Sequence, residues 1–322
     1  MSFNQLPNLT NQISRKDPFP QEGGAFGTVW RCVLRTESTE IEVAVKTIRT
    51  QSDRRRENVR QELIIWMRLH HENIVPLLGV TSGFGPDNSI SMVSTWFAQG
   101  TLTSFLAQHN TLNRGRRLEL LQDIAAGVLY LHTSQVVHGD ISGNNVLING
   151  QGKACLTDFG LSTVSGGLKD ASYFGQAGRH GAIRWAAPEL IVGAGQHSTF
   201  KSDIYSFGSI MLQVLSGDVP WSEVAAEHII IQKLTKGHVP KRPSSVSRIH
   251  WAFIRICWSS SSRDLSHPPS RPSASEIVDC LKNAQNVWHR SDSNLRSIAG
   301  SVIRRISARV TSSIPSPSGV WK

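Results

Sequence analysis

Three polar residues, Asp140, Asn145 and Asp158, most strongly restrict the fold that this chain can adopt. Asp140 and Asn145 lie five residues apart within the stretch 138–148, and Asp158 opens an Asp-Phe-Gly triplet ten residues after that stretch. Taken singly, Asp and Asn are favoured in turns for local reasons. Together they require a fold that brings two loops, separated by a short hairpin, to one place.

This spacing suits phosphoryl transfer from a nucleotide. That reaction needs one carboxylate near the acceptor hydroxyl, and an amide and a second carboxylate that hold Mg²⁺ against the phosphates. The order matches H-R-D-L-x-x-x-N followed by D-F-G, so the chain resembles a eukaryotic protein kinase catalytic domain. The closest resemblance is to the tyrosine-kinase-like group, in the HGD form frequent among fungal kinases. It implies an α+β, two-lobed protein kinase fold with a small β-rich N-lobe and a larger, mainly helical C-lobe.

A glycine-rich turn precedes a strand rich in β-branched and aromatic residues near the start of the chain. Glycines allow the backbone to approach phosphates closely. Against the kinase pattern G-x-G-x-x-G-x-V, the aligned residues are Glu22, Gly24, Gly27 and Val29, so Glu22 replaces the first glycine. Gly23 could supply the missing flexibility.

A buried ion pair is expected between Lys46 and Glu62. Lys46 ends a strand in which Ala44 points to the same face, because side chains alternate along a strand. Apolar residues at helical spacing (Val59, Leu63 and Trp66) predict a helix whose inward face includes Glu62. A carboxylate on that face is costly unless it is paired, and Lys46 is the obvious partner.

The resemblance implies a role for each matching residue. Asp140 would be the catalytic base, Lys46 would bind phosphates, and ATP and Mg²⁺ would be the cofactors. Small Ser94 would be the gatekeeper at the interlobe hinge. The predicted catalytic set is Asp140, Lys46, Glu62 and Asn145; the predicted nucleotide site is Gly23, Gly24, Gly27, Val29, Ala44, Lys46, Ser94, Thr95, Phe97, Leu147 and Asp158; and the predicted metal ligands are Asn145 and Asp158.

The C-lobe contains further matches. Ala187-Pro188-Glu189 closes the segment that Asp158 opens, and Arg271 resembles the arginine that pairs with that glutamate. The stretch 202–215 is apolar nearly all round, which predicts a buried helix. Asp203 at its start is expected to anchor the backbone of the catalytic loop.

Three positions depart from the usual kinase pattern. Gly139 replaces the arginine before the catalytic Asp, so we expect no requirement for activation-segment phosphorylation. Ser142 and Ala182 replace a Lys–Thr pair usual in serine/threonine kinases. We predict a serine/threonine kinase, with a tyrosine or dual-specificity kinase and a nucleotide-binding pseudokinase scaffold as alternatives.

We divide the chain into an N-terminal extension (1–16), a kinase domain (17–285, with lobes at about 17–95 and 98–285) and a tail (286–322). The tail holds six basic residues and one acidic residue, six minus one giving +5 of the total net charge of +10. It is either a disordered Ser-rich segment or a basic amphipathic helix, and the helix could contact an anionic membrane or an acidic partner.

The remaining features concern location and partners. The four cysteines are widely separated and form no C-x-x-C pair, there is no secretory signal pattern, and there is no run of eighteen apolar residues. We therefore expect an intracellular protein: cytoplasmic, with nuclear or membrane-peripheral locations as variants. The expected partners are ATP and a protein substrate. No interleaved aromatic and basic pattern suggests a nucleic acid.

Overall fold

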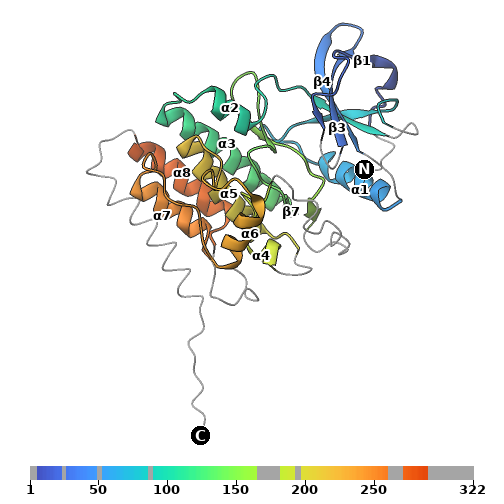
Figure 1. The fold of residues 1–322 in the computed structure, drawn as a ribbon. Helices are drawn as coiled ribbons and strands as arrows, with labels where there is room; N and C mark the ends of the chain where they lie inside the picture. The colour runs from blue at the N-terminus through green and yellow to red at the C-terminus, as the bar shows by residue number, and fades with distance from the viewer. Residues whose placement is uncertain are drawn as a thin grey trace.

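A computed structural model gives the fold of the chain (Figure 1). The residues that it describes are 6–23, 27–48, 53–85, 90–164, 182–192, 197–259 and 271–288. A strand-rich lobe is built from the first third of the chain, and a helical lobe follows it (Figure 1). The predicted α+β, two-lobed architecture is confirmed.

The smaller lobe is a six-stranded sheet with one helix, α1 (Asp53–Trp66). Its strands are β1 (Ile13–Arg15), β2 (Glu22–Gly23), β3 (Gly27–Arg35), β4 (Glu40–Ile48), β5 (Leu77–Thr81) and β6 (Ser91–Thr95). The strand order is β1-β3-β4-β6-β5, with β2 also paired to β3. All of these strand pairs are antiparallel, and the side chains along each strand alternate between the two faces of the sheet.

The N-terminal segment forms part of this lobe. Val80 at the β5 edge exchanges backbone hydrogen bonds with Pro7 and Leu9 (2.9 and 2.8 Å), whereas Ile13 pairs with Leu34 of β3 near the opposite edge. The segment, which includes a short 3₁₀ helix (Thr10–Gln12), therefore crosses one face of the sheet. The domain boundary predicted at residue 17 falls inside the sheet, between β1 and β2.

The segment crosses the sheet because it covers apolar side chains. Leu9 is 7% exposed and packs in a cluster with residues from three strands of the sheet. The members contributed by the sheet are Cys32, Leu34, Val43, Val45 and Val93. Burial of these side chains, worth roughly 25 cal/mol per Å² of apolar surface, holds the segment in place.

The larger lobe is organised around α5 (Phe200–Ser216). A reciprocal cap starts this helix, since the Thr199 side chain accepts the N–H of Ser202 and the Ser202 hydroxyl accepts the N–H of Thr199. Gly217, with φ of 93°, ends it. Residues 202–214 are all buried, which confirms the central helix predicted from its apolar sequence.

The other elements surround α5 or carry the site. The helices are α2 (Leu102–Gln108), α3 (Arg114–Thr133), α4 (Glu189–Val192), α6 (Glu227–Thr235), α7 (Arg248–Cys257) and α8 (Ala274–Trp288). The short strands β7 (Val136–Val137), β8 (Val146–Ile148), β9 (Ala154–Leu156) and β10 (Thr163–Val164) form two small antiparallel pairs, β8 with β9 and β7 with β10.

The end of α8 marks the end of the described chain. The helix runs three residues past the boundary predicted at residue 285. The predicted tail beyond Trp288, including its proposed amphipathic helix, lies outside the described residues. Among the helices that are described, none combines the length and apolar character needed to cross a membrane.

Candidate active site

One face of the sheet gathers the residues predicted to cover a nucleotide. Directly opposed residues on neighbouring strands share a face. Lys46 of β4 opposes Val29 of β3, and Ala44 opposes Ser94 of β6. These four side chains therefore line the same surface, as predicted for Ala44 and Lys46. The other face of β4 is buried in the lobe.

The glycine-rich turn is described only in part. Gly23 pairs with Thr28, and Gly27 pairs with Ile48, so the two arms of the turn continue the sheet. Glu22, which replaces the first glycine of the kinase pattern, pairs with Val29 as part of β2. Gly24 lies outside the described residues.

Lys46 makes two ion pairs at the centre of the site. Its Nζ lies 3.0 Å from Glu62 Oε1 and 2.7 Å from Asp158 Oδ1. Glu62 comes from α1 and is 3% exposed, whereas the Asp158 side chain is 36% exposed. The predicted Lys46–Glu62 pair is present, and Asp158 joins it from the other lobe.

Burial and charge act in opposite directions on these three groups. Burial alone would lower the pKa of Lys46, but the carboxylates of Asp158 and Glu62 outweigh it and hold that pKa above its usual value. Burial raises the pKa of Glu62, because the attraction of Lys46 offsets the lost hydration only in part. Burial would also raise the pKa of Asp158, but Lys46 overcomes this effect and lowers it. Lys46 is therefore a charged ammonium at neutral pH.

Asp140 and Asn145 are in direct contact. The Asn145 Nδ2 donates to both the backbone carbonyl and Oδ2 of Asp140, each at 2.8 Å. The backbone carbonyl of Asn145 accepts the N–H of Thr157 at 3.0 Å, which ties the catalytic loop to the residue before Asp158. Asp158 itself has φ of 64°, and its Oδ1 accepts the N–H of Gly160 at 3.3 Å. The three residues singled out by spacing are thus brought together.

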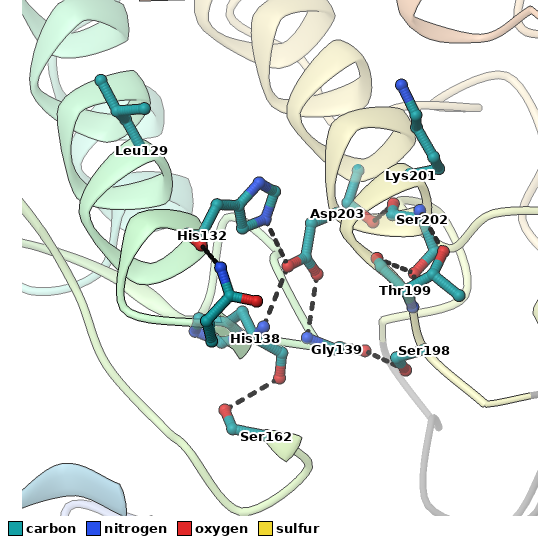
Figure 2. Close-up of polar contacts among 12 residues, drawn as sticks. Leu129, His132, His138, Gly139, Ser162, Ser198, Thr199, Lys201, Ser202 and Asp203 are labelled. Carbon is teal, nitrogen blue, oxygen red and sulfur yellow. Dashed lines mark hydrogen bonds and ion pairs between the residues drawn. The ribbon is translucent and has the colours of Figure 1, made fainter. Parts of the chain in front are cut away.

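Asp203 fixes the backbone of the catalytic loop, as Figure 2 shows. Its Oδ2 accepts the N–H of His138 and its Oδ1 accepts the N–H of Gly139, both at 2.9 Å. His132 Nε2 lies 3.0 Å from the same Oδ2. Asp203 is 1% exposed, and a buried carboxylate is tolerated because these donors satisfy it. The predicted anchoring role of Asp203 is confirmed.

Two tilted ring contacts connect α1 to the catalytic loop. The ring centroid of Phe159 lies 5.7 Å from that of Trp66 and 5.3 Å from that of His138. The Trp66 indole N–H donates to the carbonyl of Val75 at 2.7 Å, which fixes the ring. Trp66 therefore packs toward the site, and Phe159 is buried between Trp66 and His138.

The backbone of the predicted hinge is oriented so that its N–H and C=O groups could bond the edge of a nucleotide base. The Trp96 N–H donates to the carbonyl of Glu42 at 3.1 Å. Its neighbour Thr95, which opposes Val43, therefore directs its backbone N–H and C=O away from β4. The Phe97 carbonyl accepts the Gly100 N–H at 3.0 Å, and the Phe97 N–H is the predicted donor to a base.

Leu147 is attached beneath this hinge by the backbone of β8. Leu147 forms a bridge with Thr101, and the N–H of Ile148 donates to the carbonyl of Gly100 at 2.9 Å. Leu147 is half-buried against the main core. It belongs to the helical lobe, so a flat ligand between Leu147 and Ala44 would contact both lobes.

Asn145 and Asp158 form a donor set that suits Mg²⁺. Mg²⁺ is usually held by one or two carboxylates together with substrate phosphates and water. Asp158 offers a carboxylate beside the Lys46 ammonium, and Asn145, which bonds to Asp140 through its NH₂ group, offers an amide oxygen. In the part of the chain that is described, no group of three or more His, Cys, Asp or Glu side chains forms a metal site independent of phosphate.

Residues 182–189, the last part of the activation segment, form a wall that is fixed at several points. Arg271 makes two hydrogen bonds to the carboxylate of Glu189, at 2.6 and 2.9 Å, as predicted. Arg184 donates to the carbonyls of Pro220, Trp221 and Val224. Residues 165–181 of the activation segment, which include the hydroxyl-bearing Ser165, Ser172 and Tyr173, lie outside the described residues.

Ser142 and Ala182, the two positions that depart from the usual Lys–Thr pair, differ in exposure. Ser142 is 1% exposed and its backbone carbonyl accepts the Asn145 N–H, whereas Ala182 is partly exposed and its carbonyl accepts the Trp185 N–H. Neither residue carries a charge.

Sequence reasoning gave no role to Gln213 and Thr103. Gln213 is 1% exposed within α5 and bonds to Trp185 and Thr103. A role for Gln213 could have been predicted from the sequence, because a single amide within a continuously apolar helix must find hydrogen-bond partners inside the fold. Thr103 gave no such signal.

Comparisons with known proteins agree with this geometry. A family model described as protein tyrosine and serine/threonine kinase matches residues 22–281. Ephrin type-A receptor 3 of Danio rerio is 30% identical over 284 residues, covering 87% of this chain and 27% of the receptor. Dual specificity protein kinase zakA of Dictyostelium discoideum is 30% identical over 312 residues, covering 89% of this chain and 38% of that protein.

A plant protein is similar to the same degree. Serine/threonine-protein kinase CTR1 of Arabidopsis thaliana is 31% identical over 267 residues, covering 80% of this chain and 30% of that protein. The chain thus spans between 27% and 38% of the length of these three relatives.

Proposed function

Because this chain belongs to the family of protein tyrosine and serine/threonine kinases, we propose that it transfers the γ-phosphoryl group of ATP to Ser and Thr hydroxyls of proteins. The observation that carries the proposal is the contact of Lys46 with both Glu62 (3.0 Å) and Asp158 (2.7 Å). Buried ion pairs add little to folding compared with apolar packing. A cation held between two lobes by two carboxylates is therefore better explained by phosphate binding.

The catalytic loop supplies the proposed acid–base chemistry. Asp140 would orient the acceptor hydroxyl and accept its proton, a contribution of about 10²–10⁴-fold for a positioned base. The hydrogen bond from Asn145 Nδ2 to Asp140 Oδ2 restrains the rotation of that carboxylate. Lys46 would bind the α and β phosphates once ATP draws it away from Asp158.

Asn145 and Asp158 would hold Mg²⁺ in this proposal. When bound, the ion would neutralise the negative charge that develops on the phosphates during transfer. The lowered pKa of Asp158 supports this role, because an ionised carboxylate is the form that binds a cation.

The nucleotide would lie between the sheet and Leu147. In this arrangement Val29 and Ala44 cover the base, Leu147 supports it, and the backbones of Thr95 and Phe97 bond its edge. Ser94 is the proposed gatekeeper. Gly23, Gly24 and Gly27 would close over the phosphates, because glycine lets the backbone approach them.

The acceptor class is proposed from both the site and the relatives. Two of the relatives are named as serine/threonine and dual specificity kinases, which favours Ser and Thr acceptors. The loss of the usual Lys–Thr pair at Ser142 and Ala182 favours a second candidate, dual specificity that includes tyrosine. Losing both partners is less harmful than leaving one of them unpaired.

Transfer is proposed not to depend on phosphorylation of the activation segment. Gly139 offers no cation beside Asp140, so a phosphate on that segment would have no partner at this position. Treatment of the purified protein with a phosphatase is expected to leave its transfer rate within about twofold. Loss of nearly all activity, restored by rephosphorylation, would contradict this.

The tail and the location of the protein are further proposals. We favour a disordered Ser-rich tail beyond Trp288, where α8 ends, and a cytoplasmic protein. The tail has a net charge of +5, so the alternative is that it contacts an anionic membrane or an acidic partner. A liposome pull-down with and without residues 290–322 separates the two, because equal binding by both forms excludes the membrane contact.

The proposed function is tested by incubating the protein with Mg²⁺, γ-labelled ATP and a panel of generic acceptor proteins. Asp158→Asn serves as the paired variant. We expect label on Ser or Thr that is lost in the variant. Label on tyrosine would change the acceptor class, and no label despite ATP binding would indicate a scaffold that binds nucleotide without transfer.

A further inference from the structure

A line of hydrogen bonds joins the catalytic loop to the wall that precedes Glu189. The N–H of Thr103 donates to the carbonyl of Gly143 at 3.1 Å, and Thr103 Oγ1 accepts from Gln213 Nε2 at 3.1 Å. Gln213 Oε1 in turn accepts the indole N–H of Trp185 at 3.0 Å. Gly143 lies three residues after Asp140, so the line begins beside the proposed catalytic base.

The orientation of the Gln213 amide is fixed by its partners. An indole N–H can only donate, so the amide oxygen must face Trp185 and the NH₂ group must face Thr103. Gln213 is 1% exposed and Trp185 is 2% exposed. At such burial, a replacement that cannot both accept and donate leaves a polar group without a partner.

Gly143 makes steric contact with the same amide. A Cβ atom at this position would lie 2.4 Å from Gln213 Oε1 and 2.5 Å from Thr103 Oγ1, which is closer than real Cβ contacts. The catalytic loop therefore rests directly on these two side chains. A displacement of Gln213 would move both the loop and Trp185.

The line serves the acceptor side of the site. Trp185 donates its backbone N–H to the carbonyl of Ala182 at 3.0 Å, and so shapes the start of the wall. The nucleotide side is held instead by Lys46 and its two carboxylates. The hydrogen bonds of the Gln213 side-chain amide lead to Trp185 and Thr103. Both residues lie on segments separate from the sheet that would cover a nucleotide.

We propose that Gln213 is a positioning residue for the protein acceptor. It keeps the wall in register with the catalytic loop, so that an acceptor hydroxyl held by the wall reaches Asp140. The proposal rests on the phosphotransfer function proposed above. It predicts that loss of the amide weakens acceptor use and leaves nucleotide affinity unchanged.

The test compares Gln213→Met with the wild-type protein. Methionine has a similar length and removes both hydrogen bonds. We expect the KM for a protein acceptor to rise about five- to tenfold, the size of one or two lost hydrogen bonds. The Kd for ATP is expected to stay within about twofold. Trp185→Phe should give a similar rise, and the double variant should be no worse than either single variant.

Two further variants guard against a general folding effect. Thr103→Val is isosteric on a partly exposed residue, and it should raise the acceptor KM even if Gln213→Met folds poorly. Gln122→Met makes the same chemical change on α3, where Gln122 contacts the carbonyl of Leu281 at 3.4 Å, and should leave the acceptor KM unchanged. Thermal unfolding of each variant checks its fold.

The outcomes separate the two proposals. Parallel rises in the acceptor KM and the Kd for ATP, additive effects of Gln213→Met and Trp185→Phe, or an unchanged acceptor KM in Thr103→Val would each overturn the role of Gln213. In all three cases the wild-type protein still transfers phosphate. A wild-type protein that transfers none overturns the proposed function and, with it, the role of Gln213.

Discussion

Replacing Glu62 by Gln should separate folding from phosphoryl transfer. At 3.0 Å and an effective dielectric constant of about 20, the attraction between Lys46 and Glu62 is roughly 5–6 kcal/mol. Removing each ion from water costs several kcal/mol, which offsets most of this attraction. Burial raises the pKa of Glu62, so the folded state favours its neutral form more than the unfolded state does. The charge of Glu62 therefore opposes folding at neutral pH.

We expect the free energy of unfolding of Glu62→Gln to stay within about 1 kcal/mol of wild type, because Lys46 keeps Asp158 at 2.7 Å and the amide still accepts a hydrogen bond. Transfer should nevertheless fall by about 10²-fold or more, since a misplacement of about 1 Å has an effect of this size. Urea denaturation and steady-state phosphorylation measure the two quantities.

The matched control for this variant is Glu72→Gln. Glu72 pairs with Lys153 at the surface, and its side chain is 64% exposed. Neither stability nor transfer should change in the control, because exposed pairs contribute about 0–1 kcal/mol. A loss of about 3–5 kcal/mol in Glu62→Gln, as expected for breaking an ordinary buried pair, would refute the reasoning. So would a transfer rate equal to that of wild type.

Three further predictions concern the catalytic loop. Asp203→Asn places an NH₂ group against a backbone N–H, so urea denaturation should show a free energy of unfolding lower by roughly 1–3 kcal/mol. An unchanged midpoint would contradict the anchoring role of Asp203. Gly139→Ala adds a Cβ atom 2.8 Å from the Leu161 carbonyl at a residue whose φ is 81°. The same assay should show that the free energy of unfolding falls by about 1–2 kcal/mol, and a variant as stable as wild type would exclude this strain. Burial lowers the pKa of His138 below 6.5, so the unfolded state binds a proton at this residue more readily than the folded state does. The urea midpoint of the wild-type protein should therefore fall as the pH drops below about 6.5, and a midpoint that rises there would contradict this.

Much of the site could be predicted because it depends on local spacing. The interval between Asp140 and Asn145 is set by one loop, and their contact follows from it. The position of Glu62 on the inward face of α1 follows from helical periodicity, and the cost of burying its charge identifies Lys46 as partner. Asp203 could be predicted because a lone carboxylate at the start of an apolar helix needs donors nearby.

The rest depends on contacts that leave no local pattern. The segment around Leu9 crosses the sheet because its apolar side chain covers residues of β3, β4 and β6, all distant in sequence. Its own sequence contains Asn, Thr and Pro, which are also typical of a loop. Thr103 likewise gains its role only when α2 and α5 are packed together.

The central claim is that this site transfers phosphate rather than only binding nucleotide. The most direct test measures ATP affinity and phosphorylation of an acceptor protein in the same preparations of wild type and Asp140→Asn. We expect equal ATP affinity, because Asp140 is proposed to act on the acceptor and not on the nucleotide, and a loss of transfer of about 10²-fold or more in the variant. Equal transfer by both proteins, or ATP binding without transfer in wild type, would contradict it.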